Sequence, residues 1–340
     1  MNGMTFIRGM HFHGNSGNNK RVYSMKVVFH YSSGPNLSAE LASLGQQGLL
    51  VEQVAVEDKP GFARAMQDCE VLWHVLEPIT SEHINAAPNL KLIQKIGVGV
   101  NTIDVAAAEA QGIAVCNMPG TNSQAVAEMT LLLMLSALRQ VSYFDPKTRQ
   151  GTGWDFTPDI QDSLGEISGK TVGFVGFGEI PQRLAPILKA MGARIIYTAT
   201  TEKKTGIGEF QGLDQVLNAA DILSLHIPLT PETTNLIDAS AFDKMKPGSV
   251  LVNTSRGGVV DQEALINALK FGPLRAAGLD VYAREPVLKD DALLKLDNVT
   301  LTPHIAWLTS ETLKRSIGVA VENCIRLQDG KELLHQVPGN

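Results

Sequence analysis

The stretch TVGFVGFGEIP, residues 171–181, decides the fold of this chain. A short apolar run leads into two glycines, Gly176 and Gly178, and a helical pattern follows. Glycine at the first position permits a tight turn, glycine at the second permits close approach to a pyrophosphate, and the next helix offers free N–H groups. The stretch therefore predicts a strand, turn and helix that bind a dinucleotide, with Glu179 and Ile180 in the phosphate-binding turn.

The turn departs from the G-x-G-x-x-G motif at its last position, where Pro181 replaces glycine. Proline is tolerated in the first turn of a helix, because an N–H there has no intrahelical partner. The close approach of helix and strand that a third glycine permits is lost, and Glu179 adds a negative charge near the expected phosphates. We expect the site to persist with a shifted helix and a weaker affinity for phosphate.

The composition indicates an ordinary globular protein of about two domains, with 340 residues, 44% hydrophobic and 19% charged. The net charge of -6 and the lack of long basic runs argue against a nucleic-acid partner. The longest apolar run, residues 129–138, is too short to cross a membrane, so no membrane partner is expected. Three cysteines without disulfide or zinc spacing indicate no metal site. We expect a cytoplasmic protein.

Strand and helix patterns alternate twice along the chain, which predicts an α/β fold with two parallel sheets. Residues 1–24 are polar, without the apolar core of a secretory signal, and are expected to be a disordered extension. A long helix is expected at 123–140, and a polar stretch at 141–165 is typical of a domain boundary. A last helix ending at Gly330 would return to the first domain. The expected substrate domain is 25–122 plus 309–335, and the expected nucleotide domain is 123–308.

The end of the strand after the glycine turn bears on the choice of cofactor. NAD-binding chains carry Asp or Glu about 20 residues beyond the glycines, where it binds the ribose diol. Thr198 stands there instead, which removes the main discrimination against a 2′-phosphate. Thr198, Thr200 and Lys203 would hold that phosphate by hydroxyl and charge contacts. We expect NADP in preference to NAD; the alternative is that Lys203 and Lys204 are solvated loop charges.

Several longer motifs resemble the D-isomer-specific 2-hydroxyacid dehydrogenases, and most closely the hydroxypyruvate and glyoxylate reductases. They are, in chain order, KIGVGVNTID (95–104), NMPGTNSQAVAEM (117–129), DILSLHIPLTPETTNLID (221–238), MKPGSVLVNTSRGGVVDQEAL (245–265), AAGLDVYAREP (276–286) and LTPHIAW (301–307). The resemblance covers about residues 70–330. It implies a Rossmann nucleotide-binding domain and a flavodoxin-like substrate domain, both doubly wound, with a cleft between them.

The resemblance implies three catalytic residues, whose chemistry suits reduction of a 2-keto acid. Arg256 would clamp the carboxylate and carbonyl oxygens of the substrate with its planar guanidinium. His304 would be the general acid that protonates the carbonyl oxygen as hydride arrives from the nicotinamide. Glu285 would hydrogen-bond to His304, hold its orientation and keep the imidazolium populated near neutral pH.

Further residues are implied for binding. Backbone N–H groups of Val98 and Gly99 would hold the substrate carboxylate, and Trp307 would either wall the substrate pocket or fill the seam between the domains. The role of Asn101 is left open. Asp280 and the carbonyl of Thr254 would hold the nicotinamide carboxamide. The residues expected to line the rest of the cofactor pocket are His226 and Pro228.

The sequence thus predicts an NAD(P)-dependent dehydrogenase that reduces a small 2-keto acid such as glyoxylate or hydroxypyruvate. A homodimer joined through the nucleotide domain is implied, with residues 141–165 and the preceding helix as the expected contact. One alternative is a non-catalytic, dinucleotide-sensing scaffold like the corepressors of this family. Another is formate or phosphite oxidation; formate enzymes carry glutamine where Glu285 stands, which argues against the first of these.

Overall fold

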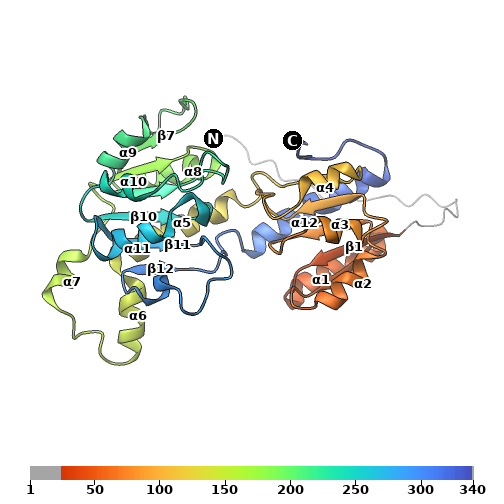
Figure 1. Cartoon of the computed structure of the whole chain (residues 1–340), viewed down its shortest axis with the longest axis horizontal. Coiled ribbons are helices and arrows are strands. Elements are labelled where there is room, and N and C mark those ends of the chain that lie inside the picture. The colour runs from red at the N-terminus through yellow and green to blue at the C-terminus, as the bar shows by residue number, and fades with distance from the viewer. Residues whose placement is uncertain (1–23, 339–340) are drawn as a thin grey trace, which may run out of the picture.

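Two parallel β-sheets organise the computed structural model, which describes residues 24–338. Each sheet is the centre of one lobe (Figure 1). The α/β fold with two parallel sheets predicted from the sequence is confirmed. The expected disordered extension falls on residues outside the described range, apart from Ser24.

The first sheet has five strands in the order β2-β1-β3-β4-β5, with every pair parallel. This is the flavodoxin-like order, in which the chain switches direction between β1 and β3. Asp58 and Asp104 cap two of its helices by accepting backbone N–H groups. The elements are β1 (Met25–His30), α1 (Pro35–Ser43), β2 (Leu49–Val54), α2 (Lys59–Met66), β3 (Val71–His74), α3 (Ser81–Asn85), β4 (Leu92–Lys95), α4 (Val105–Ala110) and β5 (Ala114–Cys116).

The second sheet has seven strands in the order β12-β11-β10-β9-β6-β7-β8. This is the Rossmann order with one strand added, and its switch point lies between β6 and β9, where ligands bind beyond the carboxyl ends. Its elements are β6 (Thr171–Val175), α8 (Glu179–Ala190), β7 (Arg194–Thr198), β8 (Glu209–Phe210), α9 (Leu213–Ala219), β9 (Ile222–Leu225), α10 (Ala239–Asp243), β10 (Ser249–Asn253), α11 (Gln262–Lys270), β11 (Leu274–Leu279) and β12 (Val299–Leu301).

Two long helices connect the lobes. Helix α5 (Ser123–Arg139) packs on α8, β10 and β11 of the second sheet. Helix α12 (Ser310–Gln328) returns to the first lobe (Figure 1). There its Ile317, Ala320 and Cys324 join the same hydrophobic core as the side chains of β1. These contacts support the domain bounds that we propose, 25–122 plus 309–335 for one domain and 123–308 for the other.

The polar stretch at 141–165 folds into two short helices, α6 (Val141–Arg149) and α7 (Pro158–Ser163), which extend from the second lobe (Figure 1). The preceding helix ends at Arg139, one residue earlier than expected, because Gln140 adopts a left-handed φ of 49°. Within residues 24–338, no single helix is long and apolar enough to cross a membrane. Helices α5 and α6 together reach that length and composition, but they meet at a bend of 68°.

Candidate active site

His304 and Glu285 form a close pair at the carboxyl edge of the second sheet. The Nδ1 of His304 lies 2.6 Å from Oε2 of Glu285, and Oε1 of Glu285 accepts the N–H of Tyr282 at 3.0 Å. Burial opposes ionisation of Glu285, but the hydrogen bond and charge of His304, the Tyr282 N–H and the charge of Arg256 outweigh it, so the pKa of the carboxyl is lowered. The carboxylate therefore remains charged and fixes which His304 nitrogen carries a proton toward it, leaving Nε2 for a substrate.

The backbone of His304 has a strained conformation that hydrogen bonds to Asp280 hold in place. Its φ is 56°, a left-handed conformation uncommon for a residue other than glycine. Its N–H donates to the carbonyl of Asp280 at 2.8 Å. The fully buried Asp280 carboxylate accepts the hydroxyl of Thr302 and the N–H groups of Ile305 and Ala306, at 2.6, 2.9 and 2.8 Å. These contacts hold the loop that presents the imidazole.

The Asp280 carboxylate, expected to bind the nicotinamide carboxamide, is thus engaged inside the protein by three donors. The carboxylate is 0% exposed, so in this structure its observed role is to hold the loop of His304. Burial raises the pKa of this carboxyl, and the three hydrogen bonds oppose that shift.

Arg256 reaches across from the second sheet to the loop that follows β4. Its Nε donates to Oδ1 of Asn101 at 3.2 Å, and its Nη1 donates to the carbonyl of Ser255 at 2.7 Å. A Cβ added to Gly99 would lie 1.8 Å from Nη2 of Arg256, so only glycine permits this approach. The two substrate-binding elements expected from the sequence therefore meet, and Asn101, whose role was left open, aligns the guanidinium.

Asn253 is a residue that sequence reasoning missed. It is 1% exposed at the end of β10; its Oδ1 accepts the N–H and hydroxyl of Ser255, and its Nδ2 donates to the carbonyl of Arg256 at 3.0 Å. The side chain thereby shapes the turn that presents Arg256. Asparagine just after a strand, where side chains satisfy turn backbone, is the signal that points to it.

The two glycines of the turn between β6 and α8, Gly176 and Gly178, have different roles. Gly176 has φ 88°, and a Cβ there would lie 2.4 Å from the carbonyl oxygen of His226, so the fold itself requires glycine. Gly178 has an ordinary φ of -83°, and a Cβ there would meet no atom of the described chain within 4 Å. Glycine at 178 leaves open space at the start of α8, which fits a pyrophosphate against backbone N–H groups.

Pro181 lies in the first turn of α8, where the missing N–H costs no intrahelical hydrogen bond. Glu179 does not point into the phosphate-binding turn. Its Oε2 accepts the hydroxyl of Ser123 at 2.8 Å, at the start of α5, and lies near Gly120. Ile180 packs between the cores of the two lobes. The carboxylate that was expected near the phosphates is therefore held at the start of α5, the helix that connects the lobes.

The end of β7 leads into a loop that lies beside the glycine turn. Thr198 ends β7 and its carbonyl accepts the N–H of Gly176 at 2.9 Å, so it lies beside the glycine turn. The hydroxyl of Tyr197 bonds to the N–H and carbonyl of Lys203, at 2.8 and 3.1 Å, and folds the loop back. Thr200 is exposed, and the Lys203 amine lies 3.3 Å from the Thr201 hydroxyl. Thr198 and Lys203 are thus parts of one loop beside the turn.

The remaining predicted pocket residues lie at neighbouring strand ends. His226 follows β9, its Nε2 lies 2.8 Å from the hydroxyl of Ser224, and burial lowers its pKa to about 3, so the ring is neutral. The hydroxyl of Thr254 lies 2.9 Å from that of Thr130 on α5, and the carbonyl of Pro228 accepts the Thr233 hydroxyl at 2.7 Å. All three surround the switch point of the second sheet.

Trp307 is 9% exposed and packs in the core of the first lobe, with its ring edge-on to Tyr31 at 6.3 Å between centroids. Its Nε1 donates to the carbonyl of His304 at 3.2 Å. This burial is consistent with the second of the two roles expected for Trp307, filling the seam between the lobes. From there the indole also supports the His304 loop. Val98, by contrast, is 43% exposed at the open side of the loop after β4.

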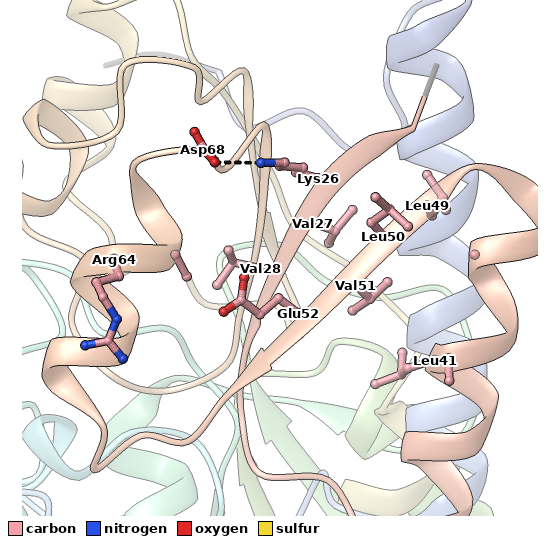
Figure 2. A pocket seen from close by; sticks show the side chains of 13 residues that line it. Lys26, Val27, Val28, Leu41, Leu49, Leu50, Val51, Glu52, Arg64 and Asp68 are labelled. Carbon is pink, nitrogen blue, oxygen red and sulfur yellow. Dashed lines mark hydrogen bonds and ion pairs between the residues drawn. The ribbon is translucent and has the colours of Figure 1, made fainter. Parts of the chain in front are cut away.

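A groove of about 670 Å³ lies elsewhere, near the amino ends of β1 and β2 (Figure 2). Apolar side chains of Val27, Leu41 and Leu49 line it, together with the ion pair of Lys26 and Asp68 at 2.6 Å. Since the predicted site residues lie at the carboxyl ends of the strands, this groove is separate from them. No group of three metal-ligating side chains occurs among the residues that the structure describes.

Comparisons with a family model, with curated proteins and with solved structures all give matches that cover much of the chain. Residues 131–306 match the family model of the D-isomer specific 2-hydroxyacid dehydrogenase, NAD binding domain. The chain is 40% identical over 284 residues to a glyoxylate reductase of Korarchaeum cryptofilum (strain OPF8), covering 82% of this chain and 85% of that protein. A D-3-phosphoglycerate dehydrogenase of Mycobacterium leprae (strain TN) is 40% identical over 293 residues, covering 84% of this chain but 54% of that protein. A crystal structure of a protein from Thermus thermophilus superposes with a TM-score of 0.83 at 35% identity, covering 92% of this chain and all of that one.

Proposed function

Since the chain belongs to the D-isomer-specific 2-hydroxyacid dehydrogenase family, we propose that it reduces a small 2-keto acid, glyoxylate or hydroxypyruvate, with Arg256, Glu285 and His304 as its catalytic residues. The observation that carries the proposal is the Glu285–His304 pair at 2.6 Å, with the charge of Arg256 acting on the same carboxylate. A cation, an acid and an acid-orienting carboxylate are the groups that reduction of a keto acid requires.

The substrate would be held by its carboxylate. The loop after β4 carries the N–H groups of Val98 and Gly99, and the guanidinium of Arg256 approaches it. The close approach of Nη2 to Gly99 brings these donors together. A carboxylate bound there would place its adjacent carbonyl oxygen toward Arg256 as well, because a guanidinium offers parallel donors. The two lobes each supply half of this site, which excludes water when they meet.

His304 would donate the proton at the carbonyl oxygen of the substrate. Its Nδ1 is engaged by Glu285, so Nε2 is the nitrogen that gives the proton. Glu285 stabilises the imidazolium by its charge and holds the ring plane, in the manner of a carboxylate behind a catalytic histidine. In the oxidative direction the same nitrogen would accept the proton.

A nicotinamide dinucleotide fits the second sheet, because Gly178 leaves open space at the start of α8 and the neutral His226 lies at the switch point. When bound, this cofactor supplies the hydride. The backbone at Gly178, Glu179 and Ile180 would hold its phosphates, and the residues around its nicotinamide would be Pro228, Thr254 and Asp280.

We favour NADP over NAD. The end of β7 carries no carboxylate that would repel a 2′-phosphate, and Thr198, Thr200 and Lys203 offer hydroxyl and cationic contacts there.

A homodimer would form through the segment of α5, α6 and α7. This segment exposes three large apolar side chains, Leu132, Val141 and Trp154, at 54%, 49% and 75%.

The Mycobacterium leprae relative favours a second candidate substrate, 3-phosphohydroxypyruvate. The decisive experiment is the initial rate of reduction of glyoxylate, hydroxypyruvate and 3-phosphohydroxypyruvate, each with NADPH and with NADH. We expect the highest kcat/KM with one of the first two and NADPH. A higher kcat/KM for the phosphorylated acid would favour the second candidate. If no 2-keto acid is turned over, the proposed enzymatic function is contradicted and the alternative of a non-catalytic, dinucleotide-sensing scaffold is favoured.

A further inference from the structure

Lys95, the last residue of β4, is a buried lysine that the mechanism so far does not use. It is 5% exposed. Its amine donates to the backbone carbonyl of Val75 and to the hydroxyl of Thr102 at 3.4 Å. Among residues 24–338 no carboxylate lies within ion-pair distance of it. Burying an ammonium without a counter-charge is costly, so the position of Lys95 needs a compensating interaction.

The charged and titratable groups around this amine are basic. In the register of the sheet Lys95 lies beside His74 of β3, whose Nε2 lies 2.9 Å from the same Thr102 hydroxyl. On the other side is Arg256. Burial, and then the charge of Arg256, lower the pKa of Lys95 to about 7. Burial, followed by the charge of Lys95 and then that of His30, lowers the pKa of His74, which stays neutral. The amine can therefore gain or lose a proton near neutral pH.

Lys95 lies directly under the loop that would bind the substrate carboxylate. Its Cε is 3.5 Å from the position of a Cβ on Gly97, and Thr102 closes the loop at the other end. Arg256 contacts the same loop at Gly99 and Asn101. One loop of five residues thus has an arginine on one side and a lysine beneath it, without a carboxylate between them.

We propose that Lys95 is a specificity-determining residue of the substrate site, whose ammonium is the counter-charge for an anion on the 97–101 loop, so that binding a 2-keto acid is coupled to uptake of a proton by Lys95. This inference rests on the proposed function only for the place of the anion. The proton comes from bulk solvent and binds to the amine, which becomes an ammonium; no other bond changes. An anion in the loop favours the charged form in the same way that an opposite charge does elsewhere.

The coupling has a defined dependence on pH. Below about pH 7 the ammonium is already present, and the affinity for an anion is at its full value. Above that pH each binding event must also take up a proton, so affinity falls by up to about tenfold per pH unit.

The test uses oxamate, an unreactive analogue of a 2-keto acid, and the full chain saturated with whichever of NADPH or NADH binds. The dissociation constant of oxamate is measured from pH 6 to 9 for the wild type, Lys95→Arg and Lys95→Met, with Lys59→Met on the surface as the control. We expect Lys95→Met to bind about tenfold more weakly at pH 6 and both Lys95 variants to lose part of the wild-type fall above pH 7. The control should match the wild type. A wild-type profile in Lys95→Met overturns the proposal.

A second measurement remains decisive if the Lys95 variants do not fold. Calorimetry of oxamate binding in buffers of different ionisation enthalpy counts protons taken up, and a His304→Ala background removes the catalytic imidazole. We expect close to one proton per oxamate at pH 8 and a much smaller uptake at pH 6; no uptake at pH 8 overturns the coupling. Keto-acid turnover with no Lys95 effect would reject this inference alone, whereas a Lys95-linked oxamate site without turnover would reject the proposed function alone.

Discussion

His304 shows how one residue can be strained for a purpose. A left-handed backbone at a residue other than glycine costs about 1–2 kcal/mol, and here φ is 56°. Contacts from Asp280, Glu285 and Trp307 hold the residue in place. Strain of this kind is retained at functional sites when the surroundings impose it. The strained backbone therefore indicates that the direction of the His304 side chain is important for function, although the conformation lowers the stability of the fold.

Replacing His304 by alanine should lower kcat by roughly 10²- to 10⁴-fold, the usual loss when a general acid is removed. Cofactor affinity, measured by quenching of protein fluorescence, should change little, since no predicted cofactor contact is removed. His335→Ala is the matched control, because His335 also has a positive φ, of 55°, but is exposed and outside the site. An undiminished kcat in His304→Ala would reject the assignment.

The motifs were sufficient to nominate Arg256, Glu285 and His304, and the structure brings them into one electrostatic group. They did not indicate the buried Lys95, nor that Asn253 shapes the Arg256 turn. The role of Lys95 depends on which strand ends lie side by side, which is a property of the sheet order rather than of the local sequence. Asn253 contacts only its own turn, at Ser255 and Arg256, but a single asparagine at a strand end is too common a pattern to single it out.

At the scale of elements, the turn between β6 and α8 contains one glycine that the fold requires, Gly176, and one that we expect only ligand binding to require, Gly178. Gly178→Ala should leave the melting temperature nearly unchanged and weaken dinucleotide binding by about tenfold or more, because its Cβ would enter only open space. Gly176→Ala, in the same turn, should lower both the melting temperature and the affinity, since its Cβ would collide with the carbonyl of His226. Equal effects of the two variants on stability would contradict this division.

The end of β7 carries the prediction about cofactor choice. Thr198→Asp should shift the ratio of kcat/KM from NADPH toward NADH, through repulsion of the 2′-phosphate that costs on the order of a few kcal/mol. Thr198→Asn is the control of equal shape without the charge and should move the ratio far less. If the aspartate leaves the ratio unchanged, residue 198 does not contact the 2′ position.

Most of the strands and helices followed from the alternation of apolar runs, and the Pro181 helix begins where the glycine turn indicates. Helices α6 and α7 were missed because both sequences are polar and α6 contains Pro146 in its interior. The edge strand β8 has two residues, too few to show an alternating pattern. The direction of Glu179 toward Ser123 could not be predicted, since it depends on how α5 crosses α8.

At the scale of the whole molecule, buried histidines in the first lobe set its tolerance of acid. Burial, and then the charge of His83, lower the pKa of His30, whose ring stacks on Phe62 at 4.0 Å and whose two nitrogens have no hydrogen-bond partner within the described structure. The unfolded chain takes up a proton on this ring below about pH 6.5, whereas the folded chain takes it up only at a lower pH. The free energy of unfolding should therefore fall as pH drops below that value, by up to about 1.4 kcal/mol per pH unit for each such histidine.

His30→Phe should remove one share of this acid sensitivity. Denaturant unfolding between pH 5 and 8 would give a shallower loss of stability for the variant than for the wild type, with exposed His335→Phe as the control. A slope as steep as that of the wild type would show that His30 does not titrate on unfolding.

The complete site exists only where the two lobes meet. The 97–101 loop comes from the first sheet, Arg256 and His304 come from the second, and the hydrogen bond from Arg256 to Asn101 at 3.2 Å joins them. We propose that hydride reaches a keto acid where the two lobes meet, while His304 supplies the proton.

The most direct test is to follow deuterium from C4 of a deuterated nicotinamide cofactor to carbon 2 of the product formed from hydroxypyruvate, with wild type and His304→Ala. We predict stoichiometric transfer to carbon 2 and the D-configuration for the wild type, with a rate at least about 10²-fold lower for the variant. Product without deuterium, the L-configuration, or equal rates for the two proteins would contradict the account.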